Sequence, residues 1–188
     1  MAKSPASVFS PQRLDAWRFA QAGAHLEGEE PLSAFRRLAE DLHSPVATDA
    51  HVRWSADGAL REAAGGGAPQ AWLHLQAQTQ VPLTCQRCLA AVQEFVEVDR
   101  WFRFVADEAA AEALDDEVEE DLLALEPRPS LIELLEDELI LSLPLVPLHT
   151  ECPQPLPAGA PPAGGAEPAE GSERPHPFAA LAKLKGRS

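Results

Sequence analysis

Thr84-Cys85-Gln86-Arg87-Cys88 is the stretch around which this chain is organised. Its two cysteines are two residues apart and stand between two segments that have the pattern of β-strands. A Cys-x-x-Cys turn presents both thiols on one side of a tight bend, where a distant Cys or His can complete a set of metal ligands. The third cysteine, Cys152, lies far downstream, three residues after His149. We therefore expect the segment that ends at Cys152 to fold back onto the turn.

Strand-like alternation of apolar and polar residues occurs on both sides of the turn and once before it. The three predicted strands are residues 46–54, 71–81 and 91–105. Asp57-Gly58 and the glycines of residues 65–67 are typical of turns. Trp101 is out of phase with its neighbours, which indicates either a bulge or a strand with two apolar faces. The spacing predicts a small antiparallel sheet or a partly closed barrel.

Helical periodicity appears at the N-terminus and again late in the chain. Residues 9–22 and 31–42 are predicted helices, and residues 25–28 are a short extended link between them. Ser130 with Glu133 has the pattern of a capping box, which predicts a long acidic and apolar helix that ends at Pro144. Its acidic residues are expected to face outward: Glu133, Glu136, Asp137 and Glu138. The predicted fold class is therefore α+β.

Composition divides the chain into three parts. Residues 1–152 have enough apolar content for a single α+β domain, whereas residues 153–175 are mostly Pro, Ala, Gly and Glu and are predicted to be a disordered linker. Residues 176–188 form a short basic amphipathic segment that includes Lys183 and Lys185. This segment either docks onto a partner or packs on its own domain.

Charge is distributed unevenly and bears on the choice of partner. The net charge is −15, and residues 106–126 carry ten acids and no base. Such a run is either a solvated surface segment or a docking element for a basic partner. A protein that binds nucleic acid through a broad basic face is thereby excluded, so any RNA contact is local or goes through a protein.

Several features of the sequence indicate a cytoplasmic protein without a membrane anchor. We find no apolar run long enough for a transmembrane helix and no signal peptide at the N-terminus. Three cysteines are an odd number in a chain without an export signal, which favours a reducing compartment over a disulfide framework.

The chemistry that these residues allow centres on a metal or on thiols. Zinc would take Cys85, Cys88, His149 and Cys152 as a tetrahedral set of three thiolates and one imidazole. The alternatives are cysteines that are merely buried, and a redox pair at the turn. Arg87 either contacts a phosphate of RNA or a partner, or holds its own loop in place. The sequence shows no catalytic triad, phosphate loop or tuned carboxylate pair, so we expect no enzymatic activity and no small-molecule substrate.

Three blocks in the same order carry a resemblance to a known family. They are the cysteine turn, residues 136–152 with the run Leu141-Ser142-Leu143-Pro144-Leu145-Val146-Pro147-Leu148-His149, and residues 177–185. Together they resemble the YceD family of large ribosomal RNA subunit accumulation proteins. The long Pro/Ala/Gly insertion before the last block departs from the family pattern. The resemblance therefore does not extend to the length and role of the predicted linker at residues 153–175.

The resemblance implies a bacterial ribosome-biogenesis factor that acts, without catalysis, in synthesis, processing or stability of 23S rRNA. Its partners would be a precursor of the large subunit, the rRNA itself or an assembly protein, with Lys183 and Lys185 as further candidate contacts. An RNA-processing enzyme is a second hypothesis, for which the sequence offers no site. A zinc- or thiol-containing protein-interaction module unrelated to rRNA is the third.

Overall fold

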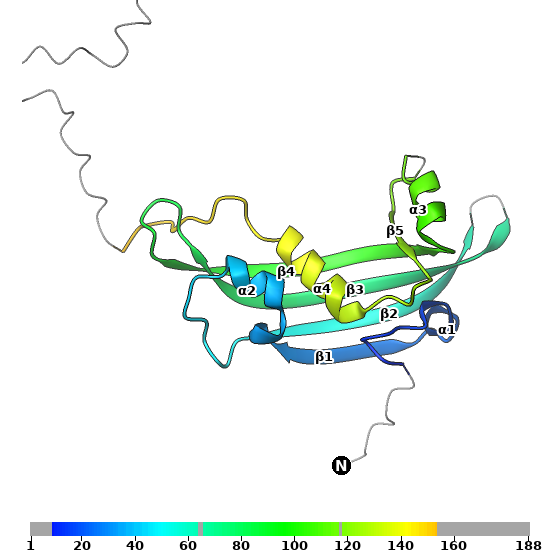
Figure 1. Ribbon diagram of the computed structural model, residues 1–188, viewed down its shortest axis with the longest axis horizontal. Coiled ribbons are helices and arrows are strands. Elements are labelled where there is room, and N and C mark those ends of the chain that lie inside the picture. The colour runs from blue at the N-terminus through cyan, green and yellow to red at the C-terminus, as the bar shows by residue number, and fades with distance from the viewer. Residues whose placement is uncertain (1–8, 64–65, 117, 154–188) are drawn as a thin grey trace, which may run out of the picture. The chain divides into compact units, whose positions relative to one another are not determined.

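The computed structural model describes residues 9–63, 66–116 and 118–153, and its elements are labelled in Figure 1. Its strands are β1 (His25–Pro31), β2 (His51–Ala63), β3 (Gly67–Thr84), β4 (Ala91–Val105) and β5 (Asp121–Ala124). Its helices are α1 (Ala16–Gln21), the 3-10 helix η1 (Leu32–Ala34), α2 (Arg36–Asp41), α3 (Glu108–Leu114) and α4 (Leu131–Leu141).

The five strands form a single sheet in the order β1-β2-β3-β4-β5. Neighbours from β1 to β4 pair antiparallel, whereas β5 pairs parallel with β4. The α+β class is thus confirmed. The prediction of a partly closed barrel is wrong, because the short strands β1 and β5 lie at opposite edges of the sheet and do not pair with each other.

The two long strands beside the cysteine turn follow the predicted alternation. β4 has the predicted bounds, and β3 extends the predicted strand in both directions. Leu73 and Leu75 are fully buried on one face, while Gln76 and Gln78 are exposed on the other. The pairing of β3 with β4 runs without a register shift through Trp101, so β4 has no bulge at this residue. Trp101 instead lies on the opposite face of the strand from the buried Phe102.

The first half of the chain differs most from expectation. Asp57-Gly58, predicted as a turn, lies inside β2, where a Cβ on residue 58 would come within 2.6 Å of the backbone oxygen of Phe19. The glycine is thus required by the close approach of α1 to the sheet. The strand predicted over residues 46–54 begins only at His51, as β2. The predicted helix over residues 9–22 is reduced to α1, and the predicted helix over residues 31–42 divides into η1 and α2. The predicted link at residues 25–28 belongs to β1.

Helices α2 and α4 lie over one face of the sheet (Figure 1). Leu131, Leu135 and Leu139 of α4 are buried against this core. The Ser130 hydroxyl accepts a hydrogen bond from the Glu133 N–H, as the predicted cap requires. The prediction that Glu136 and Glu138 face outward is wrong, because both are buried.

Glu136 replaces a missing cap on the neighbouring helix. The N-cap of α2, Phe35, has no side-chain acceptor. Glu136 Oε1 instead accepts hydrogen bonds from the N–H groups of Arg37 and Leu38, at 2.7 and 3.2 Å. Its other oxygen pairs with the Arg37 guanidinium, which also binds Asp137. The burial of this carboxylate is thereby compensated, since every buried charge needs partners.

The predicted linker at residues 153–175, apart from Pro153, and the predicted segment at residues 176–188 lie outside the described residues. They stay predictions. Among the helices that the structure describes, none has the length and apolar character needed to cross a bilayer.

Candidate metal centre

The cysteine turn closes the hairpin between β3 and β4. Thr84 and Ala91 are the last paired residues of the two strands. Between them, the Cys85 N–H donates to the Ala90 carbonyl and the Leu89 N–H donates to the Cys85 carbonyl, both at 2.9 Å. Leu89 has a positive φ of 61°, which lets the chain reverse within so few residues. The bend is therefore set by backbone bonds that fix where the two thiols lie.

The segment after α4 returns to this bend, as the sequence predicts. The Gln86 N–H donates to the Pro147 carbonyl at 2.9 Å. The Arg87 guanidinium donates to the carbonyl of His149, and the His149 N–H points at the Cys85 Sγ at 3.5 Å. Residues more than 60 positions apart in the chain are thus joined at the turn.

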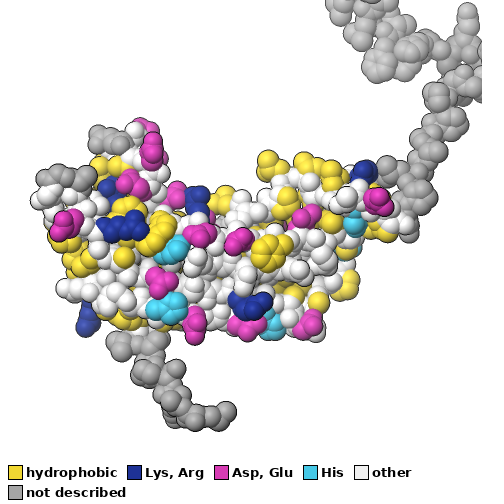
Figure 2. All heavy atoms as spheres, turned by 180° about the vertical axis from the view of Figure 1, so that it is seen from behind, with side chains coloured by type: hydrophobic (Ala, Val, Ile, Leu, Met, Phe, Trp, Pro, Cys, Tyr) yellow, Lys and Arg dark blue, Asp and Glu magenta, His cyan; other side chains and the backbone are white. Residues whose placement is uncertain are grey.

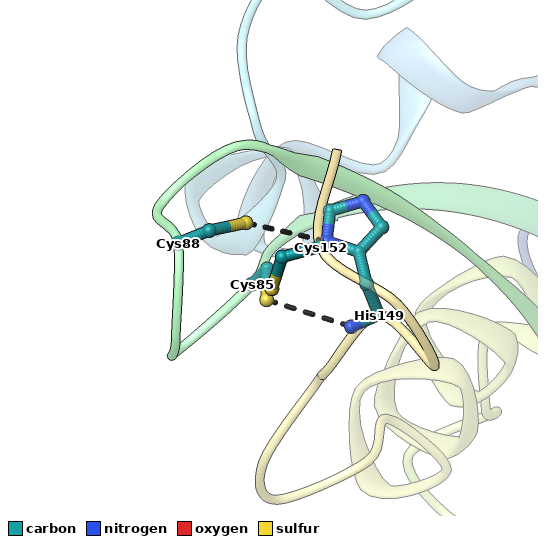
Figure 3. A group of neighbouring side chains, drawn as sticks. All are labelled: Cys85, Cys88, His149 and Cys152. Atoms are coloured by element: carbon teal, nitrogen blue, oxygen red, sulfur yellow. Dashed lines mark hydrogen bonds between the residues drawn. The ribbon is translucent and has the colours of Figure 1, made fainter. Parts of the chain in front are cut away.

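The orientation of the His149 ring follows from its two hydrogen-bonding contacts. Nε2 lies 2.9 Å from the Ala91 carbonyl oxygen, which can only accept a hydrogen bond. Nε2 therefore carries the proton in the neutral ring, and Nδ1 keeps a free lone pair. Nδ1 lies 3.4 Å from the Cys88 Sγ (Figure 3). A ligating histidine usually donates its second N–H to such an outer acceptor, which fixes the tautomer and the ring plane.

All four residues predicted as ligands come together. One ligand atom from each of Cys85, Cys88, His149 and Cys152 lies within 4.8 Å of the ligand atoms of the other three (Figure 3). Two belong to the hairpin turn and two to the returning segment. The cluster can therefore hold a metal ion, with three sulfur donors and one nitrogen donor.

The environment of Cys85 favours its thiolate. Its side chain is fully buried, and burial alone raises the pKa of the thiol. Backbone N–H groups of Cys88, His149 and Arg87 oppose this effect, and together with the His149 side chain they lower the pKa to about 5. A buried thiolate of this kind suits a metal ligand, whereas full burial keeps it from the external disulfide that a redox pair would attack.

Arg87 lies at the edge of the cluster. Besides the His149 carbonyl, its guanidinium contacts the Thr150 carbonyl at 3.5 Å. The arginine thus ties the returning segment to the turn, a role that the sequence analysis did not foresee, and places a positive charge beside the thiols. A contact between Arg87 and RNA or a partner stays a prediction. The other two predicted contact residues, Lys183 and Lys185, lie outside the described residues.

Two features of the centre were beyond sequence reasoning. The Ala91 carbonyl that orients His149 is a backbone group and leaves no signal in the residue type. The second feature is an exposed apolar segment over residues 141–148 next to the cluster. Its most exposed side chains are Leu141, Leu145 and Val146, with 75, 99 and 59% of the side-chain surface accessible, and Leu89 of the turn is 69% accessible. The apolar run was visible in the sequence, but its exposure depends on the fold.

Comparison with known proteins identifies the family. A family model described as large ribosomal RNA subunit accumulation protein YceD matches residues 73–185. The chain belongs to the YceD family. The matched region begins in β3 and includes the cysteine turn, α4 and the returning segment, so the YceD pattern covers every candidate ligand.

A relative from Haemophilus influenzae carries the same name, large ribosomal RNA subunit accumulation protein YceD. It is 36% identical over 108 residues, which are 57% of this chain and 62% of that protein. The chain thus matches less than two thirds of the length of this curated YceD relative. No solved structure matches the chain.

Proposed function

We propose that this protein is a non-enzymatic factor in the biogenesis of the large ribosomal subunit, acting in synthesis, processing or stability of 23S rRNA. Membership of the YceD family, over residues 73–185, is the observation that carries this proposal. The name of the Haemophilus influenzae relative supports the same role. In this proposal the protein acts in the cytoplasm on a precursor of the large subunit, through its rRNA or an assembly protein.

We further propose that the cluster at the cysteine turn holds one structural zinc ion. Three thiolates and one imidazole are a common ligand set for structural zinc. With bonds of about 2.3 Å to sulfur and 2.0 Å to nitrogen, the edges of such a tetrahedron are about 3.5–3.8 Å. The 3.4 Å between Cys88 Sγ and His149 Nδ1 is close to the sulfur–nitrogen edge, and the 4.8 Å limit for the whole set requires the ligand atoms to draw together by about 1 Å at most. The residues present therefore fit the ion.

The role of the zinc ion would be to join the hairpin turn to the segment that follows α4. Four protein ligands leave no open position for a substrate or water, which separates a structural site from a catalytic one. The Arg87 guanidinium beside the turn would balance part of the charge of three thiolates. No step of a reaction is assigned to this centre.

Deletion and complementation test the role in rRNA biogenesis. A deletion strain should accumulate less 23S than 16S rRNA and fewer large subunits in a sucrose gradient, most clearly in the cold. Expression of the full chain should restore both, and tagged protein should co-sediment with large-subunit precursors. An unchanged 23S to 16S ratio in the deletion strain at every temperature would contradict the proposed function.

Metal analysis tests the zinc site independently. Protein purified under reducing conditions should contain about one zinc ion per chain, and His149→Gln or Cys88→Ser should lower this content severalfold. His51→Gln is the matched control, because the His51 ring is exposed and contacts the carbonyl of Asp49 away from the cluster. Reduced wild-type protein without stoichiometric zinc would exclude the zinc site while leaving the family role untouched.

A further inference from the structure

The face of the sheet opposite α2 and α4 carries a group of aromatic and basic side chains. Figure 2 shows this face, where basic, apolar and histidine side chains gather at one end with acidic side chains among them. The strand register places Trp72 of β3 directly opposite Arg103 of β4, and His74 opposite Trp101. Arg61 of β2 completes what we call the arginine–tryptophan cluster: Arg61, Trp72, His74, Trp101 and Arg103.

The rings of the cluster are stacked. His74 and Trp101 lie parallel, with centroids 4.2 Å apart and an interplanar angle of 4°. The Arg61 guanidinium carbon lies 3.9 Å from the Trp101 ring and 4.4 Å from the Trp72 ring. Trp101 keeps 37% of its surface exposed. Neither the core on the other face nor the metal centre accounts for this stack.

Arg103 is buried, and two of its side-chain nitrogens have no acceptor within the described part of the chain. It is 9% exposed, yet its Nε and Nη2 have no hydrogen-bond partner among residues 9–63, 66–116 and 118–153. The same holds for the indole Nε1 of Trp72, which is 7% exposed. Nε and Nη2 form one edge of the guanidinium, the fork that binds two oxygens of a phosphate or carboxylate. Buried donors of this kind require an acceptor, and here the missing partner has the chemistry of an oxyanion.

We propose that the arginine–tryptophan cluster binds single-stranded RNA, with a backbone phosphate on the fork of Arg103 and a base stacked on the Trp101–Arg61 pair. This inference rests on the proposed function and names the surface through which the protein contacts rRNA. Arg61 is exposed and covers both tryptophan rings. Movement of its long side chain opens the ring faces to the ligand, and its guanidinium supplies a second cation.

The neighbouring acids leave the two arginines available. The Asp57 carboxylate is 2.7 Å from His25 Nδ1. The Asp99 carboxylate bonds His74 Nε2 at 2.6 Å and accepts from the Gln76 amide at 3.0 Å, and these bonds lower the pKa of Asp99. Both acids are thus engaged with imidazoles, while Arg61 and Arg103 form no ion pair within the described part of the chain.

The surface next to the cluster continues in a way that suits a single strand of RNA. A hollow of about 310 Å³ lies beside it, lined by Arg53, Gln76, Gln78 and Glu97 among others. Beyond the hollow, Phe95 is 59% exposed and lies opposite Gln80. Aromatic rings that stack bases, with amide and arginine groups between them, are the recurrent elements of surfaces that bind single-stranded nucleic acid. A carboxylate-bearing protein would use the arginines but leave the stacked rings without a role.

Fluorescence anisotropy with a dye-labelled, single-stranded RNA of twelve nucleotides tests the proposal on the full chain. Arg61→Gln and Trp101→Ala should each weaken binding at least about fivefold, the lower end for loss of one stacked base. Arg61→Gln should also reduce the slope of log affinity against log salt by about one. Arg36→Gln, an exposed arginine on the helical side, is the matched control and should change neither.

Thermal melting checks that each variant folds. Arg61→Gln is expected to fold normally, because the exposed Arg61 side chain is outside the core, so this variant tests the proposal even if Trp101→Ala is destabilised. RNA affinity unchanged by Arg61→Gln would overturn the proposal. A polyglutamate peptide provides a second test. If it binds as tightly as the RNA and Arg61→Gln weakens its binding equally, the proposal is overturned and the partner of this surface is an acidic protein. If deletion lowers 23S rRNA but Arg61→Gln restores it fully, the site fails while the proposed function stands.

Discussion

Glu138 is a buried carboxylate whose ionised form is poorly compensated. Its surroundings contain Arg100 of β4, 3.6 Å away, with Asp121 of β5 and Asp137 of its own helix. Burial raises the pKa of Glu138; Arg100 opposes this, and the two aspartates add to it. The pKa of Glu138 in the folded protein therefore lies above its ordinary value in the unfolded chain. Protonated Glu138 favours the folded state, and this stability is lost as pH rises through the raised pKa.

Glu138→Gln should therefore raise the melting temperature at pH values above the raised pKa of Glu138, where the wild-type carboxyl is ionised. The gain should shrink as pH falls toward the ordinary carboxyl value of 4.5, where wild type is protonated as well. Differential scanning calorimetry between pH 5 and 8 measures this, with Glu112→Gln on the exposed side of α3 as the control. A lower melting temperature for Glu138→Gln at pH values above this pKa would show that the pairing with Arg100 outweighs burial.

Leu89 has an unfavourable backbone conformation for its side chain. Its φ of 61° lies in the left-handed region, which costs an L-residue roughly 1–2 kcal/mol relative to the ordinary helical region. Because the side chain is 69% exposed, little packing compensates. Leu89→Gly should increase the free energy of unfolding by about 0.5–1 kcal/mol, measured by urea titration, after the entropy that glycine gains in the unfolded chain is subtracted.

Leu89→Val is the informative counterpart, since a β-branched residue fits this conformation worse than leucine does. It should lower the free energy of unfolding. Equal stabilities for the glycine and valine variants would mean that the turn relaxes to another conformation when residue 89 changes.

Between elements, the Glu136 carboxylate of α4 caps the first turn of α2. Glu136→Ala would leave the N–H groups of Arg37 and Leu38 without their acceptor. Each unsatisfied buried donor costs about 1–3 kcal/mol, so a loss of about 2–4 kcal/mol in the free energy of unfolding is expected. Glu40→Ala, on an exposed position of α2, should cost less than about 0.5 kcal/mol. Similar losses for both variants would exclude Glu136 as the cap of α2.

The elements that sequence could predict are those whose pattern is local. β4 and the Ser130 cap follow from alternation and from a capping motif within a few residues. β1 and β5 are short edge strands, whose pairing comes from the neighbouring strand more than from their own residues. Gly58 was mistaken for a turn because glycine at a close approach to Phe19 and glycine at a bend look alike in sequence.

In the candidate sites, too, the residues that sequence could predict are those with a local pattern. The two cysteines of the turn are recognisable by spacing, and His149 and Cys152 follow as the remaining residues of metal-ligand type near an apolar run. The Ala91 carbonyl and the arginine–tryptophan cluster depend on strand register, which brings together Arg61, Trp72 and Arg103 from three strands. No local pattern encodes that register.

Across the molecule, the metal centre is expected to decide how firmly the segment after α4 is held. Hydrogen bonds join it to the turn: Gln86 bonds Pro147, Arg87 bonds the carbonyls of His149 and Thr150, and His149 contacts Cys85, Cys88 and Ala91. Apolar burial in the segment is uneven, because Pro147 is buried whereas Leu145 is 99% exposed. The sheet, by contrast, is held by buried leucines that are not ligands, such as Leu73 and Leu75 of β3 and Leu139 of α4.

Removal of the metal should therefore open this segment without unfolding the sheet. Hydrogen exchange after chelation should speed up at residues 85–90 and 145–150, including the amides of Gln86 and His149, while the amides of β3 around Leu75 stay protected. His149→Gln should reproduce this pattern without a chelator, and His51→Gln should not. Unchanged exchange at Gln86 and His149 after complete metal loss would mean that the bonds to Pro147 and the turn suffice, whereas exchange throughout β3 would mean that the metal supports the whole fold.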